Sequence, residues 1–185
     1  MTLENPSNKF LVTQLHIPFS MTYTFHLERW FKSSEQTFSR LFFDNESKKY
    51  FCKASELKKL HPQAYVFATI SNPYYRVFLA HKNFKKVNNS NLNLTGFVNM
   101  LVDEPIVKNC SDYLDTEIDF VIKNENFETQ FSSFIEKLNL PNRLIKLKYY
   151  EPFDAKVFFN SESIKLVRKV FEKDFTLHYN KISER

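Results

Sequence analysis

The sequence predicts an α/β protein with a small parallel sheet flanked by helices. Apolar runs of strand length alternate along the chain with segments of helical spacing, which is typical of parallel strands joined by helical crossovers. Hydrophobic residues make up 43% of the chain, which is too apolar for a disordered protein. The 185 residues suit one domain with its own core, and we expect residues 1–185 to form that single domain.

Four apolar segments are expected to form the strands. "KFLVTQLHI" at 9–17 ends at Pro18, and "AYVFATI" at 64–70 is followed by polar residues. "IDFVI" at 118–122 and "LIKLK" at 144–148 are the other two. In an open parallel sheet, ligands bind outside the carboxyl ends of the strands, so the residues that follow these segments are candidates for a site.

The clearest helix start follows residue 70. Asn72 suits the N-cap, because its side chain can accept a backbone N–H, and Pro73 suits the first helical position. An apolar stripe then repeats at helical spacing. The stripe consists of Tyr74, Val77, Phe78, His81 and Phe84.

Three further helices are expected in the first 102 residues. "KASELKKL" at 53–60 and "NLTGFVNMLV" at 93–102 are two of them. The third follows Pro18 and carries apolar residues at i, i+4, i+7 and i+8. These are Tyr23, Leu27, Trp30 and Phe31.

Two amphipathic helices are expected in the last third of the chain. The first lies within 126–141 and cannot continue past Pro141; the second has Ser161 as its cap. Each places four or five apolar residues on one face. The faces consist of Phe127, Phe131, Phe134, Ile135 and Leu138, and of Ile164, Val167, Phe171 and Phe175.

The composition excludes several kinds of site. Gly96 is the only glycine, so the glycine-rich nucleotide motifs GxGxxG and GxxxxGK are absent. Two cysteines, Cys52 and Cys110, make no disulfide framework and no CxxC pair. The five histidines do not have the spacing of a metal site, so we expect no metal.

The net charge of +5 is consistent with an anionic ligand, a nucleic acid or an anionic surface, and equally with a solvated basic surface. Nucleic acid is the least expected partner, because no run of arginines with interleaved aromatics is present. No apolar segment approaches the length of a membrane span. The opening "MTLENPSNKF" lacks the apolar region of a signal peptide, so the expected location is the cytoplasm.

Four segments of the chain resemble the motifs of a known family. They are "HIPFSMTYTF" at 16–25, "ISNPYYRVFLAHKNF" at 70–84, and the segments 118–141 and 158–179. Together, and in this order along the chain, they resemble the carbohydrate sulfotransferases of the Golgi and of bacteria. The segment 70–84 is similar to the family motif in which Arg, then Asp or Asn, then Pro precede a second Arg, and 16–25 is similar to the loop that takes the 5′-phosphosulfate.

The resemblance implies a P-loop-like three-layer fold and the donor 3′-phosphoadenosine 5′-phosphosulfate. It implies transfer of a sulfuryl group to a hydroxyl of a carbohydrate or small molecule, a reaction that needs positioned reactants and stabilised charge on oxygen. Asp174 and Phe175 match the family's C-terminal motif, where we expect packing and capping. Acceptor specificity is expected in loops such as 85–95 and 103–117.

The resemblance also implies which residues form the site. His16, His26 and Glu28 are candidate proton acceptors, although a core histidine at 16 and a solvated helix face at 28 are alternatives. For Arg76 the alternative is a structural ion pair, and Lys123 with Glu125 is either structural or a brace for the site. The residues expected to contact the donor are Phe19, Ser20, Met21, Thr22, Tyr23, Thr24, Ser71, Arg76 and Lys123.

The chain departs from the family's motifs at four positions. Phe19 stands where the family has the loop Lys, Thr22 where it has Gly, Ser71 where it has the first Arg, and Leu79 where it has a Ser for the 3′-phosphate. A second hypothesis is therefore a non-catalytic relative that binds a glycan or a protein. A third is another P-loop-like transferase, or a nucleotide- or nucleic-acid-binding protein.

Overall fold

A computed structural model describes residues 11–15, 17, 18, 20, 37–39, 53–140 and 153–179. The predicted strand at 144–148 and the predicted helix after Pro18 lie outside these residues. Within them the chain is an α/β protein with a parallel sheet, as the alternation of strands and helices predicts.

The sheet has four described strands, β1 (Leu11–Leu15), β2 (Thr37–Ser39), β3 (Tyr65–Ile70) and β4 (Phe120–Lys123). Their order is β2-β1-β3-β4, and all neighbours are parallel. Three of them lie within or beside predicted segments, whereas β2 was not predicted. Because all strands run the same way, their carboxyl ends share one edge of the sheet.

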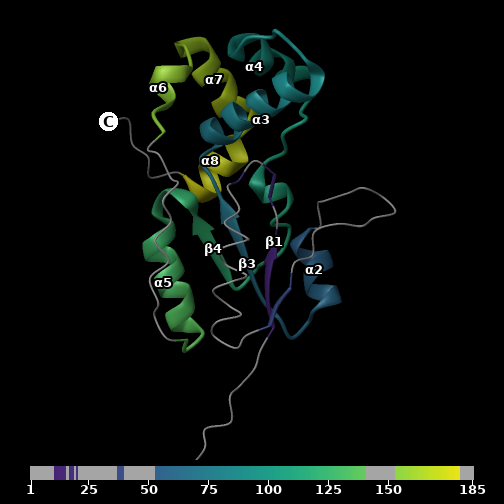
Figure 1. The fold of residues 1–185 in the computed structure, drawn as a ribbon, viewed down its shortest axis with the longest axis vertical. Helices are drawn as coiled ribbons and strands as arrows, with labels where there is room; N and C mark the ends of the chain where they lie inside the picture. Colours follow the sequence, from purple (N-terminus) through teal and green to yellow (C-terminus); the bar gives the residue numbers. More distant parts are fainter. Residues whose placement is uncertain are drawn as a thin grey trace, which may run out of the picture.

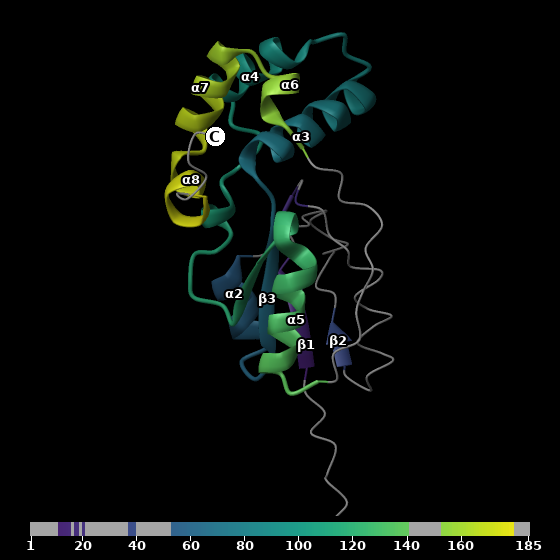
Figure 2. The ribbon, with the colours of Figure 1, turned by 90° about the vertical axis from the view of Figure 1, so that its left-hand side faces the viewer.

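Helices lie on both faces of the sheet and beyond its carboxyl edge. Figures 1 and 2 show α5 on one face, α2 on the other, and the remaining helices gathered past the ends of β3 and β4. Two short 3₁₀ turns, η1 (Cys110–Asp112) and η2 (Asn124–Asn126), lie at that edge. The described α-helices are α2 (Ala54–Leu60), α3 (Pro73–Asn88), α4 (Leu94–Asp103), α5 (Phe127–Lys137), α6 (Ala155–Phe158), α7 (Ser161–Val170) and α8 (Glu172–His178).

The predicted start of α3 is confirmed, and the predicted start of α7 is off by one residue. The Asn72 side chain accepts the backbone N–H of Tyr74 at 3.0 Å, and Pro73 occupies the first turn. At the later helix the cap is Asn160, which accepts the N–H of Ser163 at 2.8 Å, and Ser161 is already helical. The backbone breaks at Phe171, so the expected single helix is divided into α7 and α8.

The predicted apolar face of α5 is fully confirmed. All five of its residues are buried and pack with Val12, Phe67 and Ile122 of the sheet. The rings of Phe67 and Phe134 lie 5.0 Å apart. Each such side chain removed from water contributes roughly 1.5–3 kcal/mol, so α5 is held to the sheet mainly by this contact.

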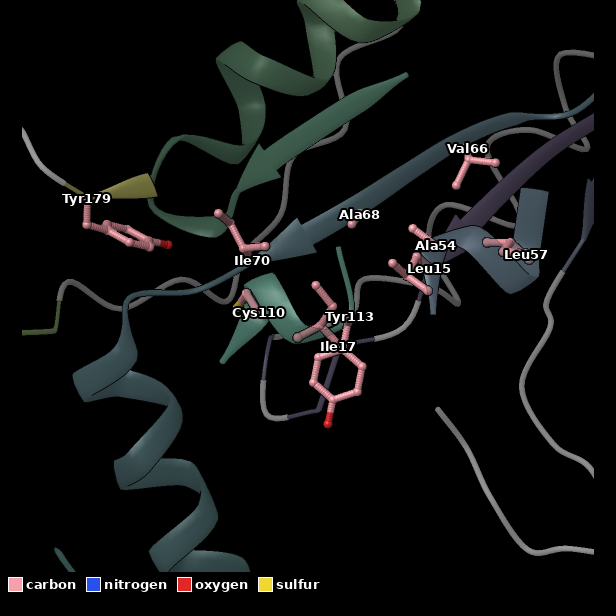
Figure 3. Close-up of a cluster of buried hydrophobic side chains, with 10 residues drawn as sticks. All are labelled: Leu15, Ile17, Ala54, Leu57, Val66, Ala68, Ile70, Cys110, Tyr113 and Tyr179. Atoms are coloured by element: carbon pink, nitrogen blue, oxygen red, sulfur yellow. The ribbon is translucent and has the colours of Figure 1, made fainter. Parts of the chain in front are cut away.

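The opposite face of the sheet packs against α2 and η1. Figure 3 shows Leu15 of β1 beside Ala54 of α2, and it shows Ile17, shortly after β1, beside Tyr113 and Ile70 of β3 near Cys110 of η1. This contact places η1 directly beside the carboxyl ends of the two central strands. Among the described residues, no helix is long and apolar enough to cross a membrane.

Candidate functional site at the carboxyl edge of the sheet

The structure brings four of the predicted site residues to the carboxyl edge of the sheet. Ser20 lies shortly after β1, Ser71 directly after β3, Arg76 in the first turns of α3, and Lys123 at the end of β4. Since β1, β3 and β4 are neighbours, these positions share one edge. The other predicted site residues lie outside the described residues; they are His16, Phe19, Met21, Thr22, Tyr23, Thr24, His26 and Glu28.

Arg76 is fully buried and is bonded within the protein through all three of its nitrogen atoms. Nη1 donates to Asp174 Oδ2 at 3.0 Å, and Nη2 donates to the carbonyl of Lys108 at 2.7 Å. Nε donates to the carbonyl of Pro18 at 3.3 Å. This is the arrangement that the structural interpretation of Arg76 predicts, because each part of the guanidinium holds a different segment.

Asp174 completes this junction from α8. Its Oδ2 also accepts the N–H of Cys110 at 2.8 Å, and its Oδ1 accepts the N–H of Ser111 at 3.1 Å. The carboxylate therefore satisfies the first backbone donors of η1 and neutralises the guanidinium of Arg76. The expected capping role of Asp174 is confirmed.

Ser71 is fully buried and is bonded to the residue that follows β4. Its Oγ accepts from Asn124 Nδ2 at 2.5 Å. Asn124 is itself buried, and among the described residues its Oδ1 has no hydrogen-bond partner. Asn124 was not predicted as a site residue; the signal was its position, as a polar residue directly after a strand.

Glu125 connects the start of α3 with the end of α8. Its Oε1 accepts the backbone N–H of Asn72 at 2.5 Å, and its Oε2 accepts the hydroxyl of Tyr179 at 3.3 Å. Burial raises the pKa of Glu125 above its ordinary value, and the nearby Lys123 opposes that rise. Burial also raises the pKa of Tyr179, so this phenol stays protonated.

Lys123 connects β4 with the same end of α8. Its Nζ donates to the carbonyl of His178 and lies 5.0 Å from the centre of the Tyr179 ring. The positive charge of a lysine is attracted both to the carbonyl groups at a helix C-terminus and to the face of an aromatic ring. Lys123 and Glu125 therefore both brace the edge of the sheet against α8.

The four segments that resemble the sulfotransferase motifs meet at this edge through two chains of bonds. Pro18, Arg76 and Asp174 form the first chain, which joins the segments 70–84 and 158–179 to Pro18, one of the three residues of 16–25 that the structure describes. Asn72, Glu125 and Tyr179 form the second chain, which joins 70–84, 118–141 and 158–179.

The chemistry available in the described part of the edge is polar rather than nucleophilic. The Cys110 thiol is fully buried, and burial raises its pKa to about 12, so the reactive thiolate is not formed near neutral pH. The described residues contain no group of three or more His, Cys, Asp or Glu side chains that could hold a metal ion. The described part therefore offers buried hydroxyl, amide and carboxyl groups.

A hollow of about 830 Å³ lies beside η1, on the loop expected to govern acceptor specificity. Its wall combines apolar side chains such as Ile106 and Val170 with the charged groups of Lys108, Asp112 and Asp115. Ser111 lines the hollow, and its neighbour Cys110 belongs to the same buried cluster as Leu15 of β1 and Ile17 shortly after it. It thus adjoins the edge that carries the candidate site.

No family model, no curated protein and no solved structure matches this chain. The sulfotransferase resemblance therefore remains a prediction that rests on the four segments.

Proposed function

We propose that this chain is a sulfotransferase-like protein that binds 3′-phosphoadenosine 5′-phosphosulfate at the carboxyl edge of its sheet. In this proposal it transfers the sulfuryl group to a hydroxyl of a carbohydrate or small molecule. The observation that supports it is the meeting of all four family-like segments at one edge, although they are spread from residue 16 to residue 179.

The reaction forms one bond to sulfur and breaks another. The acceptor oxygen attacks the sulfur, the bond from sulfur to the phosphate oxygen breaks, and adenosine 3′,5′-bisphosphate leaves. The acceptor hydroxyl loses its proton to a base, for which His16, His26 and Glu28 are the candidates. Negative charge grows on the leaving phosphate, where hydroxyl groups such as those of Ser20, Thr22 and Thr24 would donate hydrogen bonds.

Arg76 has a positioning role in this proposal. Its guanidinium holds the Pro18 carbonyl, at the start of the segment that resembles the phosphosulfate loop, and ties it to Asp174. Ser71 takes the place of the family's phosphate-binding Arg. Its hydroxyl is fully buried and accepts from Asn124 Nδ2 at 2.5 Å, so Ser71 ties the end of β3 to the end of β4 beside the proposed nucleotide.

The hollow beside η1 is the proposed place of the acceptor. It adjoins the end of β1 and carries both carboxylates and lysines, which suit a ligand rich in hydroxyl groups. Its apolar wall can contact the carbon skeleton of such a ligand.

Thermal unfolding with adenosine 3′,5′-bisphosphate tests the donor site. Ligand at 100 times its dissociation constant adds about 2.7 kcal/mol, which raises the Tm of a domain of this size by roughly 5–10 °C. Adenosine 5′-monophosphate is the control, because it lacks the 3′-phosphate. A rise with the bisphosphate and a much smaller rise with the monophosphate is the expected result. Equal responses, or none at millimolar ligand, would refute the proposed donor site.

The second candidate is a binding protein of the same fold without transfer activity. It is favoured by the engagement of Ser71, Arg76 and Lys123 with protein groups, since no charged side chain among the three is left for a phosphate. The two candidates differ in turnover of the donor. Release of adenosine 3′,5′-bisphosphate that depends on an added carbohydrate supports the enzyme, and nucleotide binding without release supports the second candidate.

A further inference from the structure

An aromatic cluster covers the outer side of α3 where α6 packs against it. The Phe78 ring lies 4.6 Å from Phe158 and 5.3 Å from Phe153, centre to centre. Phe153 and Phe158 stack almost in parallel, 5.1 Å apart, and Tyr75 lies 5.1 Å from Phe153. Because Phe78 and Phe153 both contact Phe158, these two rings form a base on which the short helix α6 packs.

Two neighbouring apolar side chains project from this base into solvent. Val157 is 72% exposed and Phe158 is 45% exposed, and both belong to the four-residue helix α6. Apolar residues scattered singly over a surface are ordinary, whereas adjacent ones beside an aromatic cluster form a patch that favours an apolar partner.

Exposed lysines lie on both helices that form this patch. Lys82 Nζ lies 4.4 Å from the centre of the Phe78 ring, which places its charge directly at the aromatic cluster. Lys156 is exposed on α6, and Lys85 and Lys86 are exposed one turn further along α3. Asp154 is the only acidic residue in 72–90 and 153–160, and its carboxylate caps α6 by accepting the N–H of Lys156 at 2.9 Å.

We propose that this α3–α6 surface, formed by Tyr75, Phe78, Lys82, Phe153, Lys156, Val157 and Phe158, docks the protein onto an anionic phospholipid membrane. Interfacial binding needs apolar side chains that enter the boundary of the acyl chains and basic side chains that meet anionic headgroups. Val157 and Phe158 supply the first, and the lysines supply the second.

A membrane fits this surface better than a soluble polyanion does. Recognition of a single-stranded nucleic acid relies on exposed ring faces for stacking, and an aliphatic side chain offers none. Val157 is the most exposed apolar residue of the patch, and it has no role in such a complex. The exposure of Val157 is explained if the partner is a membrane, because this side chain can then enter the apolar region of the acyl chains.

Co-sedimentation with lipid vesicles tests the proposal. The full chain is mixed with vesicles of phosphatidylcholine, and with vesicles in which roughly a third of the lipid is phosphatidylserine. We expect binding to the anionic vesicles, little binding to the neutral ones, and weaker binding at high salt.

Two pairs of substitutions separate the apolar and the electrostatic parts. Val157→Ser with Phe158→Ser should weaken vesicle binding at least ~10-fold, because it removes the inserted side chains. Lys82→Gln with Lys156→Gln should weaken it by roughly 25-fold, at about fivefold for each lysine. Leu60→Ser is the matched control, because Leu60 is 65% exposed beside Lys58 and Lys59 but belongs to α2, outside the α3–α6 surface, and it should leave binding unchanged.

The result can overturn the proposal in several ways. Absence of binding to anionic vesicles, equal binding to neutral vesicles, or an equal loss in the Leu60 control would each refute it. Binding of a single-stranded oligonucleotide that the lysine pair abolishes, without vesicle binding, would assign the surface to a soluble polyanion instead. A thermal unfolding curve for each variant establishes that it is folded, and the lysine pair decides the matter if the serine pair unfolds.

Discussion

Nη1 of Arg76 lies 3.0 Å from Oδ2 of Asp174, and both side chains are fully buried although 98 positions separate them in the sequence. This ion pair joins α3 to α8 and, through the other nitrogens of Arg76, to the carbonyls of Pro18 and Lys108. A buried pair is strongly unfavourable to break, because the remaining charge has no solvent to stabilise it. The carboxyl edge of the sheet therefore depends on this pair for its shape.

Asp174→Asn should lower the free energy of unfolding by about 3–5 kcal/mol, since it leaves the guanidinium of Arg76 buried without its counter-charge. Asparagine keeps the size of the side chain and an acceptor for the N–H of Cys110. Urea unfolding measures the loss. Lys173→Met is the control, because Lys173 forms an exposed ion pair at 3.8 Å with Asp112, and such pairs contribute at most about 1 kcal/mol. A loss below that level for Asp174→Asn would show that the pair is not structural.

Glu125 should make the stability of the protein fall as the pH rises. Burial raises its pKa above 4.5, so the folded state holds a proton that the unfolded state has already released between pH 4.5 and the raised pKa. Across this window the free energy of unfolding decreases by about 1.4 kcal/mol for each unit of the pKa shift. Glutamine at this position keeps an acceptor for the Asn72 N–H and has no such transition.

Urea unfolding at a series of pH values, from mildly acidic to neutral, gives the unfolding free energy of Glu125→Gln and of the unchanged protein. The quantity compared is the difference between these two free energies at each pH. We expect the difference to shift in favour of the variant as the pH rises, and to level off once Glu125 is ionised in both states. If the unfolding free energies of the two proteins change in parallel with pH, the pKa of Glu125 is not raised.

Cys110 should resist alkylation while the protein is folded. Its thiol is buried, and with a pKa of about 12 it forms on the order of 10³ times less thiolate near pH 8 than an ordinary cysteine does. The test is the rate of reaction with iodoacetamide in a Cys52→Ser background, so that one thiol is followed. Rapid labelling in native buffer, at the rate found in urea, would contradict the burial of this residue.

Local chemistry made much of the fold predictable from the sequence. Asn72 and Pro73 define the start of α3 because one caps the backbone and the other has the required φ, and neither effect depends on distant residues. The face of α5 was predictable because Phe residues recur at helical spacing. By contrast, β2 has three residues and α6 has four, which is too short for any period to appear.

Some residues have more than one interpretation in the sequence, and contacts between distant parts of the chain decide between them. Arg76 had both a ligand-binding and a structural interpretation, and the sequence contains no local sign of its partner Asp174 or of the Lys108 carbonyl. The cap of α7 was assigned to Ser161 because Asn160 and Ser161 are both good caps, and their order is decided by the backbone. The bond from Asn124 to Ser71 arises from the pairing of β3 with β4, which the sequence does not specify.

Leu79→Ser should strengthen binding of adenosine 3′,5′-bisphosphate if the carboxyl edge is the donor site. Leu79 is half-buried on α3 and stands where the sulfotransferase motif has the Ser that holds the 3′-phosphate. A hydrogen bond to a charged group contributes about 1.5–3 kcal/mol, so the dissociation constant should fall by at least ~10-fold. Calorimetric titration measures this dissociation constant.

Leu79→Ala is the matched control, because it loses the same apolar contact without gaining a hydroxyl. Adenosine 5′-monophosphate should bind both variants alike. If the serine and alanine variants bind the bisphosphate equally, the 3′-phosphate does not lie beside α3, and the family-based position of the nucleotide is wrong.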